Sequence, residues 1–166
     1  MINLNDYQDK VVECVRRICQ RYYNSSEISM SNYSGTVVSS FFVKNALLPY
    51  NRCKISSFYV SIDRTVLSIF LHFKLGDKFD YKKESIFPLV NHFNVKSSTF
   101  YIATIETKNS PVFGIQNELV ISYTSYAGYG VSSINEALNI IEEDMSGLST
   151  NKELCDIIKL ILDTAK

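Results

Sequence analysis

Hydrophobic residues recur at helical spacing along the first part of the chain. They fall every three or four positions, at Leu4, Tyr7, Val11, Val15, Ile18 and Tyr22. Polar and charged residues occupy the positions between them, so one stripe of the segment is apolar and the opposite side is hydrated. The pattern predicts an amphipathic helix that ends at about Tyr23.

Two further helices are predicted near the other end of the chain. Ser133 and Glu136 have the spacing of a capping box, in which each side chain bonds a free backbone amide, and they open a helix over residues 134–145. Thr150 and Glu153 have the same spacing and open a last helix with its own apolar stripe.

Alternation of apolar and polar residues predicts two β-hairpins in the middle of the chain. The first joins Ile55–Ile62 to Val66–Leu75, and the second joins Ser98–Thr107 to Ile115–Ser125. At residues 36–48 a strand and a short helix are both compatible with the pattern. The strand is favoured there because the apolar residues are β-branched or aromatic.

A helix is expected between the hairpins, and a loop before the first of them. Lys82–His92 repeats apolar residues at helical spacing, and Pro88 is expected near its first turn, where a proline is tolerated. Residues 24–35 are polar and rich in turn formers, which predicts a loop. The strand residues expected to be buried beneath helices are Leu67, Ile69, Leu71 and Phe73.

The predicted elements follow the order helix, three strands, helix, two strands and two helices. Neither a linker nor an internal repeat divides the chain, and its length is that of one domain. We therefore predict a single α+β domain over residues 1–166 with an antiparallel central sheet.

Net charge and cysteine content indicate which partners and which cellular compartment fit the chain. Seventeen basic residues balance seventeen acidic ones, so no net charge draws the chain to nucleic acid or to an anionic membrane. No apolar run approaches the roughly 18 residues of a membrane span, and the polar start does not resemble a signal peptide. We expect a cytoplasmic protein whose cysteines are reduced thiols, namely Cys14, Cys19, Cys53 and Cys155.

The segment "YAGYGVSS" is the most specific lead to chemistry, because Gly128 and Gly130 lie between a predicted strand and a predicted helix. A dinucleotide-binding turn also needs an acidic residue about 20 positions further on, after the next strand, and a P-loop needs a lysine. The chain has neither in the required place. We therefore predict that these glycines serve the backbone turn and that the protein binds no nucleotide there.

Other candidate catalytic groups do not converge in the sequence. His72 and His92 belong to no metal-binding pattern, and no nucleophile motif surrounds Cys53. The acidic residues Glu142, Glu143 and Asp144 are adjacent on a helix and point in different directions. The expectation is a protein that is not an enzyme and that requires no cofactor or metal.

Aromatic and acidic residues indicate a surface for another protein. The chain has eleven tyrosines and no tryptophan, and tyrosine supplies a large rigid contact with one polar end. The acidic triplet lies in the last turn of its helix, where the helix dipole disfavours negative charge. The predicted partner-binding residues are Tyr123, Tyr126, Tyr129, Glu142, Glu143 and Asp144.

A resemblance covers residues 85–145, through the helix "SIFPLVNHFN", the strands "TFYIATIET" and "ELVISYTS", and the helix "SINEALNIIEEDM". In order and pattern these segments resemble type III secretion chaperones of the small effector-binding class and the related YbjN-like domains. The resemblance implies a non-enzymatic bacterial protein that holds another polypeptide, in a chaperone-like or regulatory role. Such chaperones commonly form homodimers and are acidic overall, and this neutral chain departs from the second property.

A second class of binding protein fits the same features. An immunity protein of a bacterial toxin–antitoxin system is also a small domain without motifs that recognises one partner through charged and aromatic side chains. The gene next to this one would separate the two classes: an effector or secretion gene for a chaperone, a large toxin gene for an immunity protein. An enzyme with an unrecognised site is the third and least favoured alternative.

Overall fold

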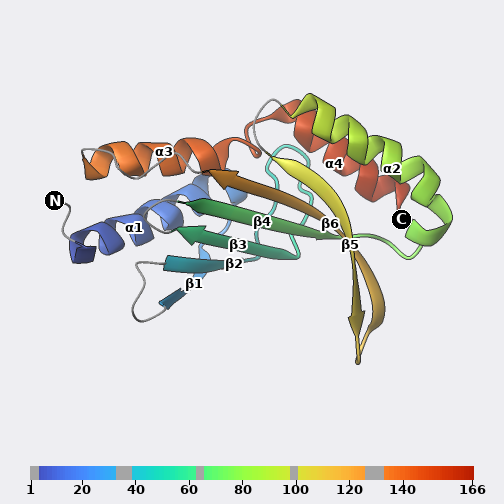
Figure 1. Ribbon diagram of the computed structural model, residues 1–166, viewed down its shortest axis with the longest axis horizontal. Coiled ribbons are helices and arrows are strands. Elements are labelled where there is room, and N and C mark those ends of the chain that lie inside the picture. Colours follow the sequence, from blue (N-terminus) through green and yellow to red (C-terminus); the bar gives the residue numbers. More distant parts are fainter. Residues whose placement is uncertain (1–3, 33–38, 63–65, 98–100, 126–132) are drawn as a thin grey trace.

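The computed structural model describes residues 4–32, 39–62, 66–97, 101–125 and 133–166, with backbone alone at residues 4–7, Asn32 and Ser39 (Figure 1). The helices are α1 (Leu4–Tyr23), α2 (Phe79–Lys96), α3 (Ile134–Ser146) and α4 (Lys152–Thr164). The strands are β1 (Glu27–Asn32), β2 (Ser39–Lys44), β3 (Ser57–Ile62), β4 (Leu67–Lys74), β5 (Ile102–Ser110) and β6 (Gly114–Ser125).

The six described strands form one sheet in the order β1-β2-β3-β4-β6-β5, with antiparallel pairing throughout. The predicted α+β class with an antiparallel central sheet is therefore confirmed. The strand favoured within residues 36–48 is β2. Both predicted hairpins also form, as β3–β4 and β5–β6, although residues 63–65 between β3 and β4 lie outside the described ranges.

The sheet has one strand that the sequence pattern did not predict. Residues 24–35 were expected to form a loop, but β1 pairs with β2 from Glu27 to Asn32, with Ile28 opposite Val43. β1 is an edge strand, and an edge strand needs only one neighbour to satisfy half of its backbone groups. Its polar side chains stay hydrated, so its composition did not distinguish it from a loop.

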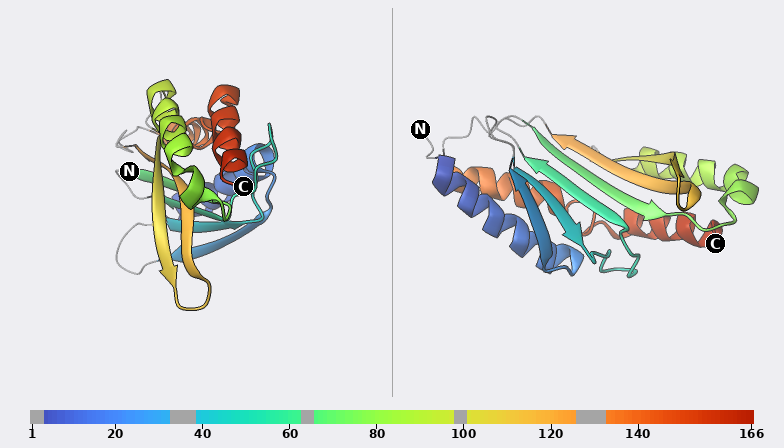
Figure 2. Two further views of the ribbon diagram at one scale, coloured as in Figure 1. Left: turned by 90° about the vertical axis from the view of Figure 1, so that its right-hand side faces the viewer. Right: turned by 90° about the horizontal axis from the view of Figure 1, so that it is seen from below.

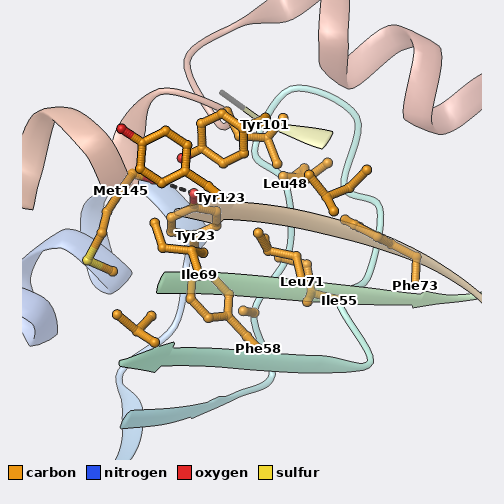
Figure 3. Packing of buried hydrophobic residues seen from close by; sticks show 14 of the residues in the cluster. Tyr23, Leu48, Ile55, Phe58, Ile69, Leu71, Phe73, Tyr101, Tyr123 and Met145 are labelled. Atoms are coloured by element: carbon orange, nitrogen blue, oxygen red, sulfur yellow. Dashed lines mark hydrogen bonds between the residues drawn. The ribbon is translucent and has the colours of Figure 1, made fainter. Parts of the chain in front are cut away.

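Helices α1, α3 and α4 lie on the same side of the sheet (Figure 2). Leu67, Ile69, Leu71 and Phe73 of β4 point to that side and are fully buried, as predicted. Tyr23 packs edge-on against Phe58 in this core, with ring centroids 4.8 Å apart (Figure 3). The opposite side of the sheet is called the open face below.

Two helix boundaries differ from the predicted ones. α2 begins at Phe79, so Pro88 lies in its interior rather than near its first turn. A proline there removes one intrahelical hydrogen bond, and Pro88 is exposed, so the carbonyl left without it faces solvent. α4 is capped by Asn151, whose side chain accepts a hydrogen bond from the Leu154 amide, and not by Thr150. The Thr150 hydroxyl bonds the carbonyl oxygen of Ser146 instead.

None of the helices in the described part of the chain combines the length and the hydrophobicity that crossing a bilayer requires.

Candidate partner-binding surfaces

Tyr123, one of the predicted contact residues, belongs to the core. It lies on β6 with 7% of its surface exposed, and its ring packs against Tyr101 at a centroid distance of 4.7 Å (Figure 3). Burial raises its pKa to about 12. The expectation that Tyr123 is exposed for a partner is therefore wrong. Its ring extends the buried face of β6 and cannot contribute contact area.

Two more tyrosines have structural roles at the same place. The hydroxyl of Tyr23 donates to the carbonyl oxygen of Met145, and that of Tyr101 donates to the carbonyl oxygen of Asp144. Both acceptors lie in the last turn of α3, where carbonyl groups have no intrahelical partner. Two of the tyrosines thus supply hydrogen-bond donors to the last carbonyl groups of α3, inside the core.

The acidic turn at the end of α3 is partly neutralised within the chain. The hydroxyl of Tyr22 donates to Glu142 at 3.3 Å, and the guanidinium of Arg21 lies 3.9 Å from the same carboxylate. Glu143 is exposed. Tyr126 and Tyr129, like Gly128 and Gly130 of the glycine-containing segment, lie outside the described residues, and their roles stay predictions.

Asp144, the last residue of the acidic turn, is half-buried. Its Oδ2 atom is buried without a hydrogen-bond partner among the described residues. Burial raises the pKa of this carboxyl group above its ordinary value of 3.8, while hydrogen bonds from Tyr123 and Ser125 act in the opposite direction. Asp144 therefore faces inward, and Glu143 is the one residue of the acidic turn whose side chain is exposed.

The open face carries an aromatic row that sequence analysis did not single out. Phe42, Tyr59 and Phe70 are directly opposite one another on β2, β3 and β4. Ring centroids are 5.0 Å apart for Phe42 and Tyr59, and 6.2 Å apart for Tyr59 and Phe70. Phe42 is 45% exposed, and the other two rings are half-buried. The signal was present in the pattern, because Phe70 occupies a position of β4 where alternation calls for a polar residue.

Hydroxyl groups border the aromatic row on one side. Ser40, Ser61, Ser68 and Thr124 stand opposite one another on four neighbouring strands. The hydroxyl groups of Ser40 and Tyr59 are 3.0 Å apart. Ser40 is buried, whereas Ser61, Ser68 and Thr124 are half-buried and form a polar margin able to bond a bound segment.

A charged group borders the row on the other side. The Glu118 carboxylate, 8% exposed, lies 3.0 Å from Nδ1 of His72 and 3.1 Å from Nζ of Lys108. A buried carboxylate is tolerated when it is paired in this way. His72 is thus held by a structural contact on the open face. His92 is exposed on α2, where it lines a shallow depression together with Glu153 and Asp156 of α4.

A shallow depression of about 370 Å³ adjoins the exposed end of the aromatic row. Phe42, Lys44, Lys54 and Ser57 are among its lining residues. Neither lysine lies within 4.0 Å of a carboxylate in the described residues. The open face therefore offers an apolar row with unpaired positive charge at one end.

The cysteines are free thiols, and three of the four are buried. Burial raises the pKa of Cys19 and of Cys155 to about 12, and it raises the pKa of Cys14 and Cys53 as well. A thiol with a raised pKa is a poor nucleophile near neutral pH because the thiolate is the reactive form. Within the described ranges, no three His, Cys, Asp or Glu side chains gather as a metal site would require.

Comparison with solved structures found distant similarity in fold. No family model and no curated protein matches the chain. The fold is similar to the crystal structure of YbjN from E. coli, a proposed transcription regulator, with a TM-score of 0.45 and 8% sequence identity over 91% of this chain and 87% of that one. At this distance the similarity does not show family membership or function.

Proposed function

We propose that this chain is a non-enzymatic protein-binding domain that holds another polypeptide against its open face, in a chaperone-like or regulatory role. The observation that carries the proposal is the aromatic row of Phe42, Tyr59 and Phe70 on a sheet surface opposite α1, α3 and α4. Large aromatic side chains on a rigid sheet are typical anchors of protein interfaces.

The chemistry of the partner follows from what surrounds the row. Apolar side chains of the partner would lie on the rings, and the hydroxyl groups of Ser61 and Ser68 would bond polar groups beside them. Lys44 and Lys54 at the end of the row carry no ion pair among the described residues, so an acidic residue of the partner would find complementary charge there. The proposed partner is therefore a polypeptide segment that combines apolar and acidic residues.

Co-purification from the native cell, with three bait proteins, tests the proposal. The baits are the wild type, Phe42→Ser in the aromatic row, and Tyr81→Ser on α2, where Tyr81 is 89% exposed. A partner of the open face is retained by wild type and Tyr81→Ser and is lost from Phe42→Ser. The identified protein is then titrated, purified, against the same three variants.

The titration decides the proposal. We expect Phe42→Ser to weaken the purified complex about tenfold or more, as removal of an interface anchor does. Equal affinity of all three variants would refute the open face as the binding surface. If the partner proves to be a toxin whose activity the chain blocks, the role is that of an immunity protein; an effector protein delivered to a secretion machinery makes it a chaperone.

A further inference from the structure

A cleft of about 580 Å³ lies between the loop before β3, the end of β4 and the last turns of α4, and it shares Lys54 and Ser56 with the depression beside Phe42. Its charged lining residues are Arg52, Lys54, Lys74, Lys159 and Lys166, with Asp163 as the single acidic one. Its apolar walls are formed by Leu75 and Leu162, and no aromatic side chain of the described residues lines it. It is called the basic cleft below.

The positive charge of the basic cleft is not balanced by the carboxylates of the described residues. Asp163 is shared by Lys159 at 2.8 Å and Lys166 at 3.1 Å. Arg52, Lys54 and Lys74 have no carboxylate within 4.0 Å among the described residues. Charged residues of one sign that line a concave surface repel one another and raise the local concentration of counter-ions. The charges thus favour an anion that reaches several of them.

The loop that carries Arg52 is held in a demanding conformation. Arg52 has a φ of 59°, in the left-handed region that side chains other than glycine, asparagine and aspartate rarely adopt. Its amide donates to the Leu48 carbonyl at 2.8 Å, and the Leu48 amide donates to the Cys53 carbonyl at 3.0 Å. The Asn51 side chain donates to the Cys155 carbonyl of α4 at 2.7 Å. These bonds fix the position of Arg52 relative to α4.

We propose that the basic cleft binds a compact polyanion that carries several phosphate groups. Arginine and lysine are the side chains that recognise phosphate oxygens, with arginine able to donate two parallel hydrogen bonds. The volume falls within the roughly 300–1,000 Å³ of small-molecule sites. The absence of an aromatic ring from the described lining favours recognition of the phosphate chain over a stacked base. The concave shape favours a compact ligand over an extended acidic peptide.

Titration with inorganic tripolyphosphate tests the site directly. The variant Arg52→Gln/Lys74→Gln removes two of the unpaired charges and leaves Lys54, which also borders the depression next to Phe42. The control is Lys82→Gln/Lys83→Gln, which removes two exposed charges from α2. We expect the cleft variant to weaken binding at least about tenfold, and the control to bind as the wild type does. If the double variant fails to fold, Lys74→Gln alone replaces it.

Labelling of Cys53 gives an independent readout, because this half-buried thiol lines the basic cleft. Tripolyphosphate is expected to slow its reaction with a neutral maleimide severalfold in the wild type and not in the cleft variant. ATP, citrate and hexaglutamate serve as comparison ligands. Tighter binding of ATP that depends on the same two residues would identify a nucleotide as the source of the phosphates.

Three outcomes would overturn the proposal: no binding of tripolyphosphate at millimolar concentration, equal affinity of the cleft and control variants, or hexaglutamate or citrate binding more tightly than the phosphate ligands. The Phe42→Ser variant should bind tripolyphosphate as the wild type does, because Phe42 lies outside the basic cleft. The outcome of the tripolyphosphate titration is therefore independent of whether the open face binds a protein.

Discussion

The side-chain amide of Asn94 exchanges two hydrogen bonds with the backbone of Ala103. Its Nδ2 donates to the Ala103 carbonyl at 3.0 Å, and its Oδ1 accepts from the Ala103 amide at 2.7 Å. Asn94 lies on α2, and Ala103 lies on the outer edge of β5. The Asn94 amide pairs with the Ala103 backbone as a neighbouring strand would. It therefore connects α2 to the sheet and satisfies two backbone groups at the edge of β5.

Asn94→Ala is expected to lower the free energy of unfolding by about 1–3 kcal/mol, because two buried backbone groups lose their partners. Urea unfolding followed by circular dichroism measures the change. Asn91→Ala on the exposed side of the same helix is the control and should change it by less than about 0.5 kcal/mol. Equal stability of the two variants would show that water replaces the Asn94 amide at no cost.

Gly76 permits a close approach between the end of β4 and the end of α4. A Cβ atom at this position would lie 2.6 Å from the Ala165 carbonyl oxygen and 2.8 Å from the Lys166 Cα. Gly76→Ala must therefore displace backbone, and we expect a loss of about 1–3 kcal/mol in the free energy of unfolding.

Gly147→Ala is the comparison for this substitution, because its Cβ would lie 3.3 Å from the Tyr101 ring and no closer than 3.5 Å, an ordinary contact distance, to backbone. A side-chain ring can yield where backbone cannot, so Gly147→Ala should cost less. Thermal unfolding of both variants checks the order, and the reverse order would contradict the close packing at Ala165.

Reaction with a maleimide should separate Cys53 from the other thiols. Cys14, Cys19 and Cys155 are buried, and burial raises the pKa of each, so the folded protein should acquire a single adduct near neutral pH. Mass spectrometry should locate it at Cys53. Labelling in urea, where all four cysteines are exposed, supplies the reference. Fast labelling of Cys19 in the folded state would contradict the packing of α1.

Asp144 should make stability depend on pH in a direction opposite to that of most carboxylates. Burial raises its pKa in the folded state, so the folded protein binds this proton more tightly than the unfolded chain. The resulting stabilisation is full below the unfolded-state pKa, about 3.8, and is lost as the pH rises through the higher folded-state pKa.

Asp144→Asn removes this dependence. We expect the variant to be the more stable protein at neutral pH and to lose that advantage as the pH is lowered. Urea unfolding at a series of pH values measures the difference, with Glu143→Gln as the exposed control. An advantage that stays constant over the whole series would contradict the assignment to Asp144.

Much of the fold followed from periodicity, and the exceptions have physical causes. The β3–β4 hairpin and α3 were predicted because alternation and capping residues are local signals. β1 was missed because an edge strand exposes polar side chains as a loop does. The start of α2 was misplaced because an exposed proline is tolerated inside a helix when the carbonyl it leaves unpaired reaches water.

The surface was less predictable than the fold. Tyr123 was assigned to a contact surface from composition, but a tyrosine on a strand next to Tyr101 can as well extend the core. Only the pairing of β2, β3 and β4 reveals that Phe42, Tyr59 and Phe70 form one row. The basic cleft was also not predictable, because Arg52, Lys74 and Lys166 are far apart in sequence. Both surfaces depend on contacts between distant segments.

Phe42→Ala and Phe73→Ala should separate the open face from the core. Phe73 is fully buried beneath the helices, and its truncation should cost about 3–5 kcal/mol in the free energy of unfolding, because it leaves a cavity. Phe42 is 45% exposed on the opposite side of the sheet, so its truncation exposes little new surface. We expect a loss of about 1 kcal/mol or less for Phe42→Ala, chiefly from its contact with Tyr59. Urea unfolding of both variants measures the contrast. If Phe42→Ala lowers the free energy of unfolding as much as Phe73→Ala does, the aromatic row supports the fold. That outcome would contradict the proposal that the open face binds a partner.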